Sequence, residues 1–409
     1  MLTKNWANDR ALIAVIVVAA LGYFVDIYDL LLFSIVRVKS LREMGIPDEQ
    51  LMSVGGTLLS DQMWGMLFGG VLWGILGDKR GRLSVLFGSI LIYSIANILN
   101  GLVETVESYR WLRFFAGLGL AGELGAGITL VSEMMQRERR GYGTTIVATV
   151  GILGAVVAYF VSQLWDWRTA YFVGGGMGLA LLILRVSVYE SGMFNSVKKT
   201  DVQRGQFLSL FTNAANFRKY AQCILIGTPT WFVMGILVAF SKEFSEALGV
   251  SDGVADPGRA VMWAYTGLTL GDLSSGLLSQ WLRSRKKSML IFHLLSAATI
   301  ALYLSTSGGT LGSFYTKILL MGYGVGYWAI FVTIGSEQFG TNLRATVTTT
   351  VPNFARGMLP LIIMAFTALR ATNGLIGAAV IIGCVTVGIA LTALYFIPET
   401  FGKDLDYTE

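Results

Sequence analysis

The sequence predicts an all-α polytopic membrane protein with twelve transmembrane helices in two similar halves. Only 14% of its 409 residues are charged and 54% are hydrophobic, whereas a soluble globular chain carries about 25% charged residues. The apolar residues stand in long runs that do not alternate with polar ones, which favours helices over a β-barrel. The same composition excludes intrinsic disorder.

The individual spans follow from the length of a bilayer helix, which needs about 20 mostly apolar residues. The predicted spans cover residues 11–36, 54–76, 84–103, 110–134, 143–164, 169–188, 220–241, 260–281, 288–305, 311–335, 346–369 and 374–397. The first span is too long and too acidic for a cleaved signal peptide. An even number of spans places both termini on one side.

The basic residues assign that side. Loops on the side of the termini carry more than twice as many Lys and Arg as loops on the opposite side. The positive-inside rule therefore predicts an inner or plasma membrane protein with both termini in the cytoplasm. This bias explains the net charge of +5, so the charge gives no evidence for nucleic-acid binding. Cys223 and Cys384 fall inside predicted spans, where no disulfide framework is expected.

An internal repeat divides the chain. A polar stretch, 189–219, is the predicted linker between bundles 1–188 and 220–409. One spacing recurs 204 residues later: Ser132-Glu133, Arg140 and Thr144-Thr145 are matched by Ser336-Glu337, Arg344 and Thr348-Thr349. Two six-span halves with a site between them are typical of rocking transporters, so transport is the leading hypothesis.

The loop between spans 2 and 3 is the most specific motif. It runs Gly-Ile-Leu-Gly-Asp-Lys-Arg-Gly-Arg over residues 74–82 and resembles the signature loop of the major facilitator superfamily. The corresponding second-half loop departs from it, with Gln280 and Trp281 where an acidic–basic pair is expected. Segments 26–29, 113–123, 337–357 and 398–400 are similar to the branch of sugar porters, organic-ion transporters and metabolite or aromatic-acid proton symporters. The resemblance implies the superfamily fold of two pseudo-symmetric six-helix bundles and rocker-switch alternating access, and it leaves the cargo open.

Charged side chains at membrane depth are costly and are candidates for function. Those of the first half, which we predict to couple protons, are Asp26, Asp29, Asp61, Arg113 and Glu123. A low dielectric favours the protonated carboxylic acid and a nearby Arg favours the carboxylate, so an Asp that alternates between the two can follow the proton gradient. The resemblance to proton–sugar symporters implies that Asp29 and Arg113 form such a pair. The alternative is that Arg113 only holds spans 1 and 4 together.

Arg356 is the leading candidate for substrate binding in the second half. A guanidinium grips a carboxylate with two parallel hydrogen bonds, and the resemblance to organic-anion carriers implies that an Arg here faces the cavity. The alternative is a salt bridge to Asp272 in span 8. Lys317 is a further substrate candidate, unless it extends to the membrane surface. The aromatic candidates for the substrate site are Tyr327, Trp231, Tyr28 and Tyr265, with Tyr23, Phe232, Tyr323 and Trp328 at similar depth.

Charged residues at the loop ends are predicted to gate the cytoplasmic side, because ion pairs there can lock one end while the other opens. These residues are Asp78, Arg82, Glu133, Arg140, Glu337 and Arg344. The single histidine, His293, stands in an apolar span, where packing is favoured over proton relay. Without a His or Cys cluster or a Walker loop, we expect no metal, no cofactor and no use of ATP.

The sequence thus predicts a monomeric, proton-coupled symporter that moves a small organic anion inward. A proton-driven exporter of amphipathic compounds, a sugar uniporter or symporter, and a receptor that binds without transport are the alternatives. No nucleophile–base pair supports an enzyme.

Overall fold

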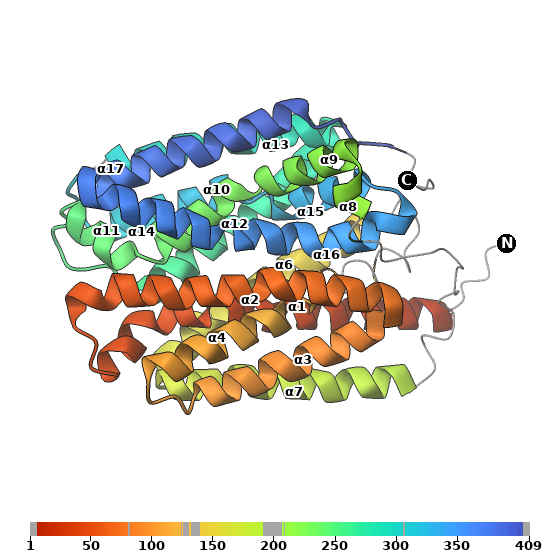
Figure 1. Ribbon diagram of the computed structural model, residues 1–409, viewed down its shortest axis with the longest axis horizontal. Helices are drawn as coiled ribbons and strands as arrows, with labels where there is room; N and C mark the ends of the chain where they lie inside the picture. Colours follow the sequence, from red (N-terminus) through yellow and green to blue (C-terminus); the bar gives the residue numbers. More distant parts are fainter. Residues whose placement is uncertain are drawn as a thin grey trace.

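The computed structural model describes residues 6–80, 82–123, 125, 131, 140–190, 207, 209–305 and 307–403, and every regular element in these ranges is a helix. The helices lie roughly along one axis, and the two halves lie side by side across it (Figure 1). Helix α1 begins and α17 ends at the same end of the molecule. We call this the terminal end and the opposite one the far end.

The first half contains the helices of the first six predicted spans. They are α1 (Trp6–Glu43), the short η1 (Asp48–Gln50), α2 (Leu51–Arg80), α3 (Arg82–Asn100), α4 (Val106–Leu120), α6 (Arg140–Leu164) and α7 (Trp167–Glu190). Several exceed the predicted spans: α1 continues seven residues past the predicted end at 36, to Glu43. These extra turns carry polar side chains into the protein.

The second half is more interrupted. Its elements are α8 (Ser209–Thr212), α9 (Ala214–Leu225), α10 (Thr228–Phe232), the π-helical η2 (Val233–Val238), α11 (Ser241–Ala247), α12 (Pro257–Trp281), α13 (Arg285–Ser305), α14 (Leu311–Gly324), α15 (Trp328–Glu337), α16 (Thr341–Gly357) and α17 (Leu359–Phe396). Helix α17 holds the end of span 11 and all of span 12, because Gly374 takes φ 69° and reverses the chain at the far end. A positive φ of this kind favours glycine.

The repeat is visible in the structure at spans 4 and 10. Helix α4 is capped by Thr105, whose side chain accepts from the Ser108 N–H, and α14 is capped in the same way by Thr310 and Ser313. The helices then end at Leu120 and Gly324, 204 residues apart, the same offset as the sequence repeat. Both spans therefore break at equivalent depth.

The break in span 10 exposes backbone N–H groups, and an acidic side chain satisfies one of them. Asp272 of α12 is buried, and its carboxylate accepts a hydrogen bond of 2.8 Å from the Ala329 N–H in the first turn of α15. A negative charge at a helix N-terminus is stabilising because the aligned peptide dipoles leave partial positive charge there. Asp272 thus holds α12 against the start of α15.

The halves meet along two related seams, α2 against α16 and α6 against α12. Small residues allow close packing at the first: a Cβ added to Gly70 would stand 2.8 Å from Asn353 Cβ. The central site lies in this interface.

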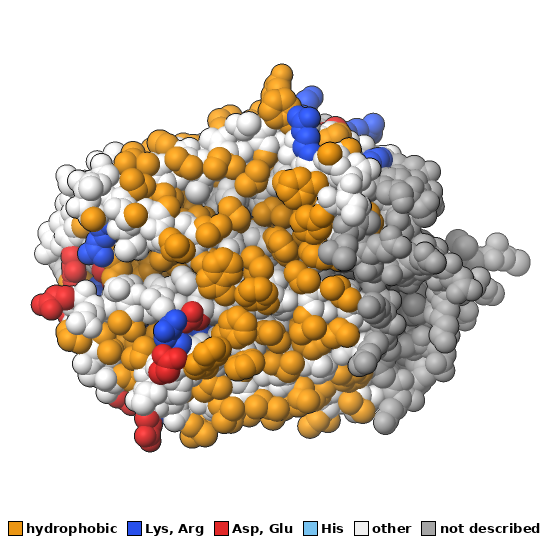
Figure 2. Space-filling view, viewed as in Figure 1, with side chains coloured by type: hydrophobic (Ala, Val, Ile, Leu, Met, Phe, Trp, Pro, Cys, Tyr) orange, Lys and Arg blue, Asp and Glu red, His pale blue; other side chains and the backbone are white. Residues whose placement is uncertain are grey.

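The surface suits a bilayer. Figure 2 shows hydrophobic side chains covering the middle of the molecule, with charged residues mostly toward its ends. Within the described residues, seven segments are long and apolar enough to cross a membrane, and one of 51 residues, Thr346–Phe396, includes the Gly374 reversal. Other passes fall short of that criterion, as α3 does because its apolar part, Ser84–Asn100, is short. The chain is a multi-pass membrane protein with twelve transmembrane helices in two six-helix bundles.

Gly326→Ala is expected to lower the melting temperature of the purified protein in detergent. An added Cβ would stand 2.7 Å from the Gly271 carbonyl carbon and 2.8 Å from the Asp272 nitrogen. The backbones must therefore separate, which costs about 1–3 kcal/mol. Gly276→Ala, in the same α12, is the matched control because no described atom lies within 4 Å of its added Cβ. Equal melting temperatures for the two variants would contradict this close approach.

Candidate functional site

Charged side chains are buried between and within the halves. Asp26, Asp29 and Arg113 are fully buried, and Glu123, Arg185, Asp272 and Arg356 are at most 2% exposed. An isolated buried charge is costly unless it is paired or hydrogen-bonded. Their partners therefore indicate what each one does.

Asp26 lies near the middle of α1 and is fully buried. Neither of its carboxylate oxygens has a hydrogen-bond partner among the described residues. Its strongest electrostatic neighbour is Arg356 of α16, followed by Glu123 and Asp29. Tyr23, one turn before Asp26, also lies within the fields of Arg356 and Asp26. Asp26 and Arg356 thus interact electrostatically across the interface, with no hydrogen bond or ion pair between them in the described structure.

Arg356 is surrounded by indole rings. Its guanidinium carbon lies 5.7 Å from the Trp231 ring centroid and 5.5 Å from that of Trp328, and these rings meet edge to face at 5.9 Å. The Nε of Arg356 and both indole N–H groups lack an acceptor among the described residues. The predicted alternative of an Arg356–Asp272 ion pair is not formed, because Asp272 caps α15 instead. Buried donors around a cation suit an anionic ligand.

Asn353 links this group to the other half. Its Oδ1 accepts from Arg356 Nη1 at 3.2 Å, while its Nδ2 donates to the Ala121 carbonyl at 2.8 Å. Ala121 stands in the turn that ends α4. The side chain that holds Arg356 is therefore bonded to the break in span 4.

Glu123 follows that break and is half of a buried ion pair. Arg185 of α7 donates to both of its oxygens, one bond being 3.0 Å long, and Gly22 of α1 abuts the pair. The sequence-based candidates do not include Arg185, which stands three residues before the predicted end of span 6 at 188. The signal that could have found it is Glu123 itself, since a buried acid requires a basic partner.

Asp29 and Arg113 lie together, within the first half. Arg113 donates to the Asp29 backbone carbonyl at 3.5 Å, to Asn97 Oδ1 at 3.5 Å and to the Tyr171 hydroxyl at 3.4 Å. Its guanidinium also lies 5.7 Å from the Phe33 ring. The Asp29 carboxylate senses Arg113 but makes no ion pair with it within 4 Å in the described structure. This group packs α1 against α4 and α7.

Two of the sequence candidates point elsewhere. Asp61 is 21% exposed and pairs with Arg110 at 2.7 Å. The Tyr28 hydroxyl donates to the Ala170 carbonyl of α7 at 2.9 Å. Two residues along a helix are about 200° apart, so Tyr28 faces away from the side that carries Asp26.

Of the remaining candidates in the second half, one lies near Arg356 and the others have different surroundings. Tyr265 is buried and lies within the field of Arg356. Tyr327 instead stacks on His293, with ring centroids 4.7 Å apart. Both His293 ring nitrogens face backbone carbonyls, those of Met289 and Ile226. Lys317 is half-buried on α14.

Of the predicted gate, only the Glu337 side chain is described; Glu133 and the side chains of Asp78, Arg82, Arg140 and Arg344 lie outside the described residues. Glu337 accepts from Arg285 at 3.4 Å and from the Thr400 hydroxyl at 2.7 Å, both in its own half. Glu399, the residue before Thr400, accepts hydrogen bonds from the backbone N–H groups of Arg285 and Lys286 in the first turn of α13. Burial alone would raise the pKa of the Glu399 carboxyl, but hydrogen bonds from Ser284 and from backbone N–H groups lower it below its usual value.

An ion pair joins the halves at the far end. Arg37 of α1 is 1% exposed and donates from both Nη atoms to Glu243 of α11, each bond 3.0 Å long. Its guanidinium carbon lies 4.8 Å from the Phe240 ring centroid. Sequence reasoning placed Arg37 in an outer loop, and the longer α1 carries it into the seam.

A second far-end contact is exposed. Asp48 of η1 accepts from Arg42 at 2.8 Å and from Lys242 of the opposite half at 3.0 Å. These hydrogen bonds lower the pKa of the Asp48 carboxyl well below its usual value. The Arg37–Glu243 pair, with side chains 2% and 16% exposed, is therefore the more buried of these two contacts between the halves.

Arg185→Leu is expected to lower the melting temperature strongly, because it leaves Glu123 buried without its counter-charge, at about 3–5 kcal/mol. Glu123→Leu combined with Arg185→Leu should recover most of that loss, since a buried pair is often worth little against apolar residues. Arg110→Leu, which breaks the partly exposed pair with Asp61, is the control and should cost at most about 1 kcal/mol. A double variant less stable than Arg185→Leu alone would contradict the pairing.

Known proteins are similar to this chain in sequence or in fold. The chain is 25% identical over 406 residues to the putative niacin/nicotinamide transporter NiaP of Bacillus subtilis, covering 96% of each chain. It is 26% identical over 411 residues to a putative metabolite transport protein of Haemophilus influenzae, covering 95% of this chain and 96% of that one. The solved structure of the proton:xylose symporter XylE superposes with a TM-score of 0.72 at 17% identity, covering 97% and 98% of the two chains.

The family model described as Major Facilitator Superfamily matches residues 12–358. The match takes in the first half, the break in span 10 and the α16 segment that carries Asn353 and Arg356. Such proteins are transporters and not enzymes. The chain belongs to the major facilitator superfamily of membrane transporters.

Proposed function

We propose that this transporter is a proton-coupled symporter that carries a small organic carboxylate into the cell, with both termini in the cytoplasm. The observation that supports it most directly is the group of buried donors on Arg356, Trp231 and Trp328, beside a buried Asp26. A carboxylate would supply the acceptors that these donors lack within the described structure, with two oxygens suited to the guanidinium fork.

The surroundings of Arg356 favour an aromatic acid. Trp231, Trp328 and Tyr265 present ring surfaces, which pack well against a flat apolar body. Niacin, named for the Bacillus subtilis relative, is an aromatic monocarboxylate of this kind. The proposed cargo class is therefore an aromatic or heteroaromatic monocarboxylate, with Arg356 on its carboxylate.

Coupling would arise from competition for Arg356. In the empty site, an ionised Asp26 balances the Arg356 charge across the interface. A cargo carboxylate on Arg356 replaces that balance, and the low dielectric then favours protonated Asp26. The site has the same net charge in both states, which gives one proton per monoanion.

The halves 1–188 and 220–409 would then rock as two bodies about this site, joined by linker 189–219. Opening the far end requires the Arg37–Glu243 pair to part. Opening the terminal end requires the Asn353–Ala121 bond to part, together with the contacts we assign to the cytoplasmic gate residues. Asp29 and Arg113 stay within one half in this movement, so we assign them a secondary part in coupling.

The rivals fit the site less well. An exporter of amphipathic cations would bring a positive charge against Arg356. A neutral sugar would not displace Asp26 from Arg356, so proton binding would need another cause. Sugar hydroxyl oxygens could accept from the donors around the guanidinium, but they carry no charge to balance Arg356 in place of Asp26.

Uptake of labelled nicotinate by proteoliposomes is expected to rise with an inward proton gradient. With one proton per monoanion, one pH unit supports about tenfold accumulation, and membrane potential alone supports none. Asp26→Asn should abolish accumulation yet retain exchange at equal concentrations, because a permanently neutral side chain no longer carries the proton. Arg356→Gln should abolish both.

Protein-free vesicles give the background, and Arg259→Gln, which neutralises an exposed arginine, is the matched control. Uptake that ignores the proton gradient would refute coupling. Accumulation driven by membrane potential would refute the one-to-one balance. Full uptake in Arg356→Gln would refute the anion site.

The far-end pair is expected to act as a gate. Arg37→Glu alone should slow nicotinate counterflow about tenfold or more, since two like charges would face each other in the closed seam, where such a clash costs several kcal/mol. Arg37→Glu with Glu243→Arg should restore much of the rate. Arg110→Gln, whose pair lies within one half, should leave the rate within about twofold. A double variant as slow as the single one would argue against direct pairing during the cycle.

A further inference from the structure

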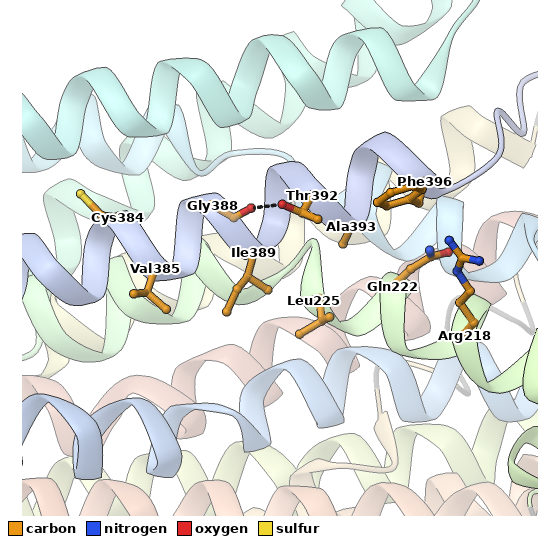
Figure 3. A pocket seen from close by; sticks show the side chains of 10 residues that line it. All are labelled: Arg218, Gln222, Leu225, Cys384, Val385, Gly388, Ile389, Thr392, Ala393 and Phe396. Atoms are coloured by element: carbon orange, nitrogen blue, oxygen red, sulfur yellow. Dashed lines mark hydrogen bonds between the residues drawn. The ribbon is translucent and has the colours of Figure 1, made fainter.

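A groove runs along the outer face of the second half, between α9 and α17. Its volume is about 580 Å³, and Figure 3 shows its lining side chains. Leu225, Val385 and Ile389 line the apolar length, while Arg218 and Gln222 lie near the end marked by Phe396. That end is the terminal end, where α9 begins and α17 finishes.

The apolar length faces out of the protein. Val385 is 48% exposed, Ile389 40% and Phe396 54%. In a multi-pass membrane protein this surface meets lipid chains and not water. A hollow of this size between two spanning helices therefore has lipid as its neighbour.

The polar end has a specific charge. Arg218, one turn into α9, is exposed, and its guanidinium carbon lies 5.2 Å from the Phe396 ring centroid. The described ion pairs involve other residues, so Arg218 keeps its donors for a ligand. The Gln222 side chain, one turn further along α9, is largely buried beside the groove. A cation and an amide at the membrane boundary, above an apolar channel, match a phosphate with an acyl chain.

We propose that this groove binds one anionic phospholipid, with its phosphate on Arg218 and Gln222 and an acyl chain along Leu225, Val385 and Ile389. Charge complementarity favours an anionic lipid over a zwitterionic one, because the described groove presents a cation and no carboxylate. The lipid would bridge α9 and α17 within the second half.

The position gives the lipid a structural consequence. Leu225 is the last residue of α9, directly before the turn that leads into α10 and Trp231. The Ile226 carbonyl in that turn also bonds His293 of α13. A bound lipid would therefore stabilise the position of α9, which directly precedes α10 and its Trp231, whatever the cargo is.

The test uses the full chain purified in a nonionic detergent, titrated with phosphatidylglycerol or with phosphatidylcholine of the same acyl chains. Native mass spectrometry counts bound lipid, and thermal unfolding measures stabilisation. We expect one tightly bound phosphatidylglycerol, a rise in melting temperature, and weaker binding of phosphatidylcholine. Arg218→Gln should weaken phosphatidylglycerol binding about fivefold and remove the preference between the lipids.

Two further variants separate the parts of the proposal. Lys287→Gln removes an exposed charge at the same end and should leave binding unchanged. Val385→Trp should block the groove to both lipids, with an unchanged melting temperature in lipid-free detergent as evidence of folding. Equal affinity for the two lipids, unaltered binding in Arg218→Gln, or binding that survives in a folded Val385→Trp would each overturn the assignment. So would a second copy of the chain occupying this face in place of lipid.

Discussion

The buried charges of Asp26 and Arg356 lie in opposite halves and interact electrostatically across the interface, without a hydrogen bond or an ion pair between them in the described structure. Each side chain is buried, and each lacks the full set of local partners that a buried charge normally requires. The surrounding structure supplies partial compensation for Arg356 through the side-chain Oδ1 of Asn353 and two indole faces, which leaves capacity for a ligand. A direct Asp26–Arg356 salt bridge with all its hydrogen bonds made would leave Arg356 fewer free donors for a ligand.

The two halves solve one structural problem with different chemistry. Spans 4 and 10 break at equivalent positions, and each break leaves backbone groups that need partners. In span 4 the Ala121 carbonyl accepts from Asn353 of the opposite half. In span 10 the Ala329 N–H donates to Asp272 of the same half. The break in span 4 is therefore hydrogen-bonded to the opposite half, whereas the break in span 10 is hydrogen-bonded within its own half.

The class, the number of spans and the family could be predicted from sequence because they rest on long apolar runs, loop charge and a conspicuous loop motif. The burial of Asp26, Asp29, Arg113, Glu123 and Arg356 was also predictable, since each stands deep in an apolar run. Their pairing was not. Depth along a helix does not identify the partner on a neighbouring helix, so the sequence does not show that Arg356 lies near Asp26 and Arg113 near Asp29.

Residues near helix ends were missed for a related reason. Arg37 and Arg185 stand within a few residues of predicted boundaries. Helix α1 continues seven residues past its predicted end, which brings Arg37 from a predicted loop into the interior, whereas Arg185 lies within the predicted span and α7 extends only two residues beyond it. Asp61 lies within α2 as expected, but its partner is the partly exposed Arg110 of α4, which the sequence does not identify. Partners such as Arg185 for Glu123 are far apart in sequence and become visible only when the helices are packed.

The Arg37–Glu243 contact has one more consequence. Removing two charges from water costs nearly as much as their attraction returns, so a buried pair adds little net free energy to the closed form. Such a contact makes the alignment of α1 against α11 specific but adds little to its stability. In the proposed transport cycle, this pair would therefore add little to the free-energy difference between the closed and open forms of this end.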